Sequence, residues 1–166
     1  MTDSFDEQAG HRYFAASCFN GAWDILDQES RKDEEVEEMI DCAHASRMHW
    51  RHRDDQTPKT RSISAWQISR VYAVAGRPDE ALRYGTEALD IARLGSAGEF
   101  YTAYGHEAVA RAAASLEDSE TARLHIEAAR ELLPSIPEGD SRNVLSADLD
   151  AIAVQHSLTN DEREFR

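Results

Sequence analysis

The sequence contains few of the residues that interrupt helices and few of those that cross-link small domains. Among its 166 residues there are only four prolines, eight glycines and two cysteines. Because proline and glycine are the strongest helix breakers, their scarcity favours an all-α fold. Two cysteines do not make a disulfide framework, so we expect Cys18 and Cys42 to be thiols in a reducing cytoplasm.

Positive charge and long apolar runs are also scarce. Eighteen Lys and Arg residues stand against 32 Asp and Glu residues, which gives a formal net charge of −14 at pH 7. A chain this acidic is poorly suited to a nucleic-acid backbone or an anionic membrane, so we expect neither as a partner. No apolar run approaches the roughly eighteen residues of a membrane span, and no secretory signal opens the chain. These absences predict a cytoplasmic protein.

Motifs of several enzyme classes are missing as well. The sequence has no glycine-rich phosphate loop, no G-x-S-x-G nucleophile motif and no C-x-x-C pair. We therefore expect no cofactor and name no catalytic residue. An enzymatic role stays open, but a non-catalytic protein is favoured.

Residues 62–92 have the pattern of two amphipathic helices that fold back on each other. The apolar stripe of the first helix, at i, i+3, i+4 and i+7, consists of Ile68, Val71, Tyr72 and Ala75. Gly76 then suits the left-handed position that ends a helix, and Pro78 suits the opening turn of the next. In the second helix, the small residues Ala81 and Ala88 allow close approach of the two backbones.

This hairpin resembles the tetratricopeptide repeat. The residues at matching positions are Ile68, Ser69, Tyr72, Gly76, Ala81 and Ala88. The sequence departs from the family at Trp66, which is one position away from the family's tryptophan, and at Arg93, which lies near the place of its closing proline. The resemblance implies a right-handed array of antiparallel helical hairpins whose concave face binds peptides.

The rest of the chain repeats the pattern at a longer interval. Ala122 and Ala129 follow Ala81 and Ala88 at a common offset of 41 residues, against roughly 34 in the family. We predict a single domain over residues 1–166 with about seven helices, including a C-terminal capping helix. The predicted hairpins are at about 5–53, 62–94 and 99–134, and the predicted cap is at about 141–158.

The same offset predicts a binding site on the inner face of the array. It places Glu107 and Arg111 at the positions of Trp66 and Arg70, which the resemblance implies face the groove. With Tyr104 on the same helix, these residues form our predicted ligand- or peptide-binding site. Two arginines one repeat apart could bind a carboxylate or phosphate, with an aromatic ring beside them. Alternatively, the arginines pair with acids such as Glu107 and only hold the hairpins in register.

A second hypothesis starts from three histidines within nine residues, His44, His49 and His52. They could contribute to a small-ligand or metal site, with or without enzymatic activity, between the second, third and fifth helices. The residues of that His/Arg/Glu pocket would be His44, His49, Arg70, His106 and Glu107. The i,i+4 histidine pair of zinc proteases is absent. The alternative is that the histidines lie apart and bind nothing.

The patterns together favour a non-catalytic module that binds a protein or peptide on its concave face. The partner could carry an acidic or carboxylate group. A homodimer through the apolar residues of the first helix is also possible, because that helix is apolar on two sides.

Overall fold

The computed structural model describes the backbone of residues 6–164 and the side chains of residues 6–154. This part of the chain contains seven α-helices, one short 3-10 helix and no strand, which confirms the predicted all-α fold. The α-helices are α1 (Glu7–Leu26), α2 (Asp33–Arg51), α3 (Pro58–Val74), α4 (Pro78–Leu94), α5 (Glu99–Ser115), α6 (Ser119–Leu132) and α7 (Asp140–Glu164). None of the described helices is long and apolar enough to cross a membrane.

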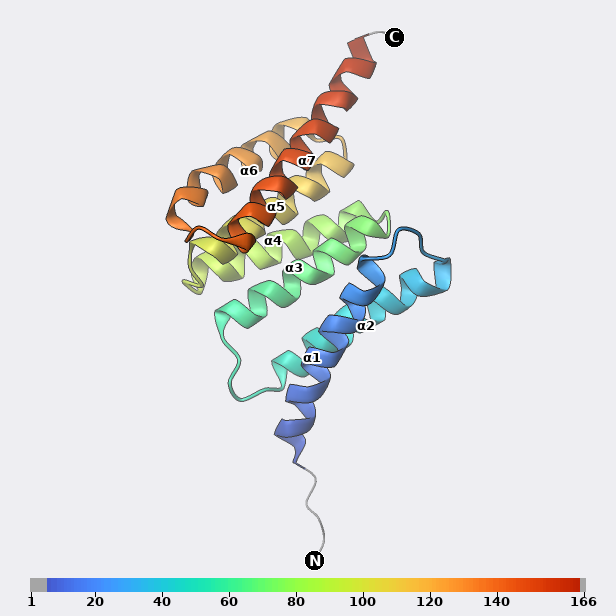
Figure 1. The fold of residues 1–166 in the computed structure, drawn as a ribbon, viewed down its shortest axis with the longest axis vertical. Helices are drawn as coiled ribbons and strands as arrows, with labels where there is room; N and C mark the ends of the chain where they lie inside the picture. The colour runs from blue at the N-terminus through green and yellow to red at the C-terminus, as the bar shows by residue number, and fades with distance from the viewer. Residues whose placement is uncertain (1–5, 165–166) are drawn as a thin grey trace, which may run out of the picture.

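The helices form an array of hairpins, as the sequence predicts. Each of the pairs α1–α2, α3–α4 and α5–α6 packs along its length, and extensive packing of α4 on α5 joins the second hairpin to the third. The hairpins follow one another along the long axis of the molecule, with α1 and α7 at opposite ends (Figure 1). The last helix, α7, packs against α5 and α6 and so covers the end of the array.

Two buried clusters hold the array together. One lies among α1, α2, α3 and α4, and includes Met39, Ile68 and Val71, all fully buried. The other extends from α3 to α7, where Leu145 and Leu149 are fully buried. Trp23, Tyr72 and other half-buried rings pack at their borders. The core runs through every hairpin. Side chains from helices that are far apart in the sequence therefore contact α3 and α5.

Two helix boundaries differ from the predicted ones. The predicted loop before residue 62 is shorter, because α3 begins at Pro58. Thr57 precedes it as the N-cap and its hydroxyl accepts a hydrogen bond from the Thr60 amide at 3.3 Å, while proline at the first helical position sacrifices no hydrogen bond. The capping helix, predicted to end at about residue 158, continues to Glu164. No glycine or proline follows Gly139 to stop it.

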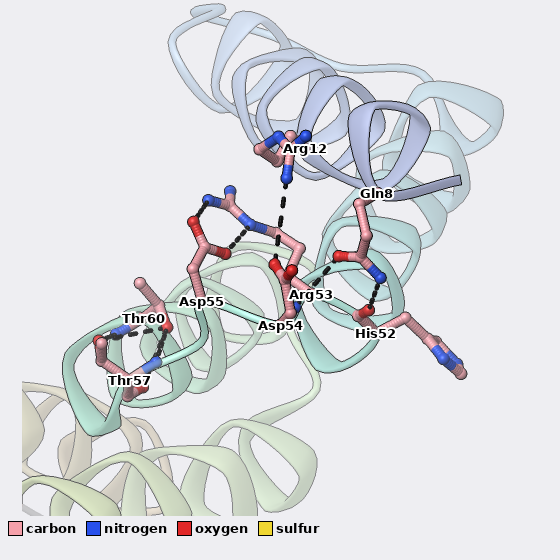
Figure 2. Close-up of polar contacts among 8 residues, drawn as sticks. All are labelled: Gln8, Arg12, His52, Arg53, Asp54, Asp55, Thr57 and Thr60. Atoms are coloured by element: carbon pink, nitrogen blue, oxygen red, sulfur yellow. Dashed lines mark hydrogen bonds and ion pairs between the residues drawn. The ribbon is translucent and has the colours of Figure 1, made fainter. Parts of the chain in front are cut away.

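The beginning of α1 and the loop between α2 and α3 are tied together. Figure 2 shows Gln8 of α1 between the two: its Nε2 donates to the His52 carbonyl and its Oε1 accepts from the Asp54 amide, both at 3.1 Å. Arg53 donates to Asp55 at 2.8 and 2.6 Å within the loop. The predicted start of the first hairpin, near residue 5, lies outside the described residues, and α1 begins after the N-cap Asp6.

Candidate functional site

The predicted site residues meet around one buried carboxylate, Glu107. Glu107 lies on α5 and is fully buried. The Trp66 Nε1 atom on α3 donates to its Oε2 at 2.9 Å. The Arg111 Nε atom, one helical turn further along α5, donates to its Oε1 at 2.7 Å, and Arg70 Nη1 from α3 lies 3.5 Å from the same oxygen. The 41-residue offset therefore brings together the residues that it predicted to be neighbours.

A residue that the sequence analysis missed, Asp148 on α7, completes the cluster. Its Oδ1 atom lies 3.3 Å from Arg111 Nη2 and 3.6 Å from Arg70 Nη2. Two guanidinium groups thus share two carboxylates, and opposite charges alternate across α3, α5 and α7. Asp148 follows Glu107 by the same 41 residues that separate Glu107 from Trp66, so one more step of the offset could have found it.

The aromatic residues of the predicted site belong to the core. Trp66 is only 7% exposed and Tyr104 only 8%. The Trp66 ring packs against Tyr104 of α5, with centroids 5.1 Å apart, and against Trp23 of α1 at 5.8 Å. Burial, with the carboxylates of Asp148 and Glu107 as smaller causes, raises the pKa of Tyr104 to about 12. The two rings therefore present little surface to solvent at this place.

The two arginines keep part of their surface open to solvent. The Arg70 and Arg111 side chains are 22% and 21% exposed, whereas that of Glu107 is 1% exposed. Their contacts with Glu107 fit the structural alternative, in which the arginines hold successive hairpins in register. The exposed part of each side chain leaves room for a second role, because five N–H donors on each guanidinium exceed what two carboxylate contacts use.

The three histidines of the predicted His/Arg/Glu pocket, His44, His49 and His106, lie in three separate places. His44 Nε2 is 3.0 Å from the Tyr72 hydroxyl. His49 Nδ1 lies 2.9 Å from Nδ1 of His11 on α1, and His106 pairs with a histidine of α6 at 3.1 Å. None of these contacts includes Arg70 or Glu107, and the described residues contain no group of three or more side chains arranged to hold a metal ion. The structure therefore does not assemble the predicted His/Arg/Glu pocket.

The surroundings of His44, His49 and His106 each lower the pKa of the imidazole. Burial, with the neighbouring His125 and Arg93 as smaller causes, lowers the pKa of His106 to about 4. Burial is also the main cause that lowers the pKa of His44 and of His49. Partly buried imidazoles that each contact another ring fit a packing role between helices.

No family model, curated protein or solved structure matches this chain.

Proposed function

We propose that the protein is a non-catalytic, tetratricopeptide-like module that binds a peptide or protein segment on the face formed by α3, α5 and α7. The observation that supports this function is the pairing of Arg70 and Arg111. The two guanidinium groups come from successive hairpins, share Glu107 and Asp148, and keep about a fifth of their side-chain surface exposed. A peptide that lies across the helices would meet both.

The buried Glu107 makes this pair suitable for recognition. It fixes both arginines without covering them, so little side-chain entropy remains to be lost when a ligand binds. A guanidinium group binds a carboxylate through two parallel hydrogen bonds, and its free N–H groups also bind backbone carbonyls. The preferred ligand is a peptide with an acidic side chain or a C-terminal carboxylate.

The partner could also be a second copy of the chain. Tyr13 and Phe14 of α1 are 66% and 46% exposed and contact each other with ring centroids 5.2 Å apart. This exposed apolar pair is the part of the first helix that would support a dimer. The free thiols Cys18 and Cys42 fit action in the cytoplasm, where thiols stay reduced.

The test is a selection from a peptide library that contains both free and blocked C termini, followed by fluorescence polarisation. We expect peptides with an acidic side chain or a free carboxylate to be selected. The double variant R70K/R111K keeps both positive charges but loses the planar guanidinium groups, and we expect it to weaken binding at least about tenfold.

The matched control is R123K/R130K, which changes two arginines that pair with exposed acids on α6 and α7. It should leave peptide affinity unchanged. Circular dichroism and urea unfolding would show that both variants keep the fold. Equal affinity of R70K/R111K and the wild type for every selected peptide, or failure to select any peptide, would overturn the proposal.

A further inference from the structure

A cavity lies between the C-terminal half of α2 and α4. Its volume is about 500 Å³, within the usual range of small-ligand pockets. The residues that line it are His44, Arg47, Met48, Arg51, His52, Arg83, Tyr84 and Glu87. None of them belongs to the Arg70–Arg111 cluster, so this cavity is independent of the proposed peptide site.

The cavity concentrates positive charge in a protein whose net charge is −14. Three guanidinium groups line it, against the single carboxylate of Glu87. Arg47 forms an ion pair with Glu87. Within the described part of the chain, no carboxylate pairs with Arg51 or Arg83, so the cavity carries an excess of two positive charges.

Aromatic contacts hold one side of the cavity in place. The Arg83 guanidinium lies over the Tyr84 ring, 4.1 Å from its centroid, and the Arg47 guanidinium lies 5.2 Å from the same centroid. Tyr84 in turn stacks on Tyr72 with an interplanar angle of 9°. A guanidinium that packs on a ring keeps its N–H groups free, because the contact uses the face of the cation and not its donors.

His44 closes the same aromatic cluster. Its ring meets Tyr72 and Tyr84 edge to face, with centroids 5.8 and 5.5 Å away. Burial lowers its pKa, and the positive charges of Arg47 and Arg83 lower it further. The positive potential of the cavity therefore acts on the His44 imidazole. An anion bound in the cavity would offset that potential and raise the pKa of His44.

We propose that this cavity binds a small anion with phosphate or carboxylate groups, held by Arg51 and Arg83. Both guanidinium groups line the cavity, lack a carboxylate partner and offer planar pairs of N–H donors that match either group. Arg47 and Glu87 form one wall and fix the position of α2 relative to α4. The inference goes beyond the proposed peptide-binding function and does not depend on it.

The experiment is an NMR titration of the ¹⁵N-labelled full chain with inorganic phosphate and, separately, with citrate, at constant ionic strength. We expect saturable shifts confined to amides near the C terminus of α2 and the first half of α4. We also expect the pKa of His44 to rise in the presence of the bound anion. Saturation by phosphate alone would assign a phosphate ligand, saturation by citrate alone a polycarboxylate, and either result supports the proposal.

The variant R51Q/R83Q should weaken binding at least about tenfold, since it removes the two charge-assisted contacts. The control R123Q/R130Q lowers the net charge by the same amount at exposed positions elsewhere, and it should leave the affinity within about twofold of the wild type. Shifts that never saturate with either anion, or that are equal in R51Q/R83Q and the control, would overturn the proposal.

Discussion

The side chain of Glu107 is only 1% exposed, so its carboxylate is buried. Arg70 and Arg111 contact one of its oxygens and Trp66 donates to the other. We expect Glu107→Ala to lower the free energy of unfolding by about 3–5 kcal/mol, because two guanidinium groups and an indole N–H lose their partner. Urea unfolding followed by circular dichroism measures the change.

A matched control for this substitution is Glu127→Ala. Glu127 is exposed and pairs with Arg123 within α6, and pairs of this kind contribute less than about 1 kcal/mol. If both substitutions lower the free energy of unfolding by the same small amount, the contacts of Glu107 do not stabilise the packing of α3 on α5.

His106 makes stability depend on pH. Its pKa is about 4 in the folded chain and close to the ordinary 6.5 when unfolded. Between these values the unfolded state binds the extra proton, so the stability that His106 contributes is complete above about pH 6.5 and falls as the pH decreases. We expect His106→Gln to reduce the loss of stability between pH 7 and pH 4.5 by about 2–3 kcal/mol.

Urea unfolding of the wild type and His106→Gln at the two pH values measures this difference. An NMR titration in which the His106 ring ionises near pH 6.5 would contradict the prediction.

Among the helices, the contact of α4 with α5 depends on glycine. A Cβ atom added at Gly105 would lie 2.6 Å from the Leu89 Cα atom and 3.0 Å from the Leu89 amide nitrogen. The backbone of α4 cannot move away without repacking both helices. We therefore expect Gly105→Ala to lower the free energy of unfolding by about 1–3 kcal/mol, despite the higher helix propensity of alanine.

The same substitution at Gly21 of α1 is the control. A Cβ atom there would lie 3.5 Å from Cys42 Sγ, which is an ordinary contact. Helix propensity then decides the outcome, and Gly21→Ala should stabilise the protein by up to about 1 kcal/mol. Thermal and urea unfolding of the two variants should therefore shift in opposite directions, and shifts of the same sign would argue against a close α4–α5 contact.

The sequence predicts the number of helices better than it predicts where each helix begins and ends. Apolar periodicity identifies a helix through its buried stripe, and this predicted seven helices. It says little about a first turn that is exposed, as at Pro58 of α3. Thr57 followed by Pro58 is an N-cap and first-position signal, but a proline inside a polar segment also fits a loop, and only the tertiary structure decides between them.

For the whole molecule, α7 protects the open end of the array. Leu145 and Leu149 are fully buried and Ile152 is 1% exposed, so removal of residues 140–166 would expose their partners on α5 and α6. It would also leave Arg70 and Arg111 without Asp148. We expect the shortened chain to self-associate and to lose cooperative unfolding, because terminal repeats with a polar outer side keep such arrays in solution.

Size-exclusion chromatography with light scattering and urea unfolding test this expectation against the full chain. The substitution Val144→Ala, at a position 55% exposed on the outer side of α7, should change neither property. A shortened chain that stays monomeric with an unchanged urea midpoint would contradict the capping role.

The candidate site shows where sequence periodicity reaches its limit. A constant offset predicted that Glu107 and Arg111 follow Trp66 and Arg70, and these residues do meet. The offset does not indicate how deeply each side chain is buried, because burial depends on side chains from other helices. Trp66 is buried because Trp23 arrives from α1 and Tyr104 from α5, and the separation of the histidines likewise depends on which helix each one packs against.

The contact of Trp23 with Trp66 also gives the protein an optical property. Two indole rings with centroids 5.8 Å apart exchange excitation energy, and both rings lie where α1 meets α3. The remaining tryptophan, Trp50, lies under the Arg53 guanidinium at 3.9 Å, and no tryptophan follows Trp66 in the chain. Tryptophan emission therefore reports on the first two hairpins directly, and on α5 through the contacts of Trp66 with Glu107 and Tyr104.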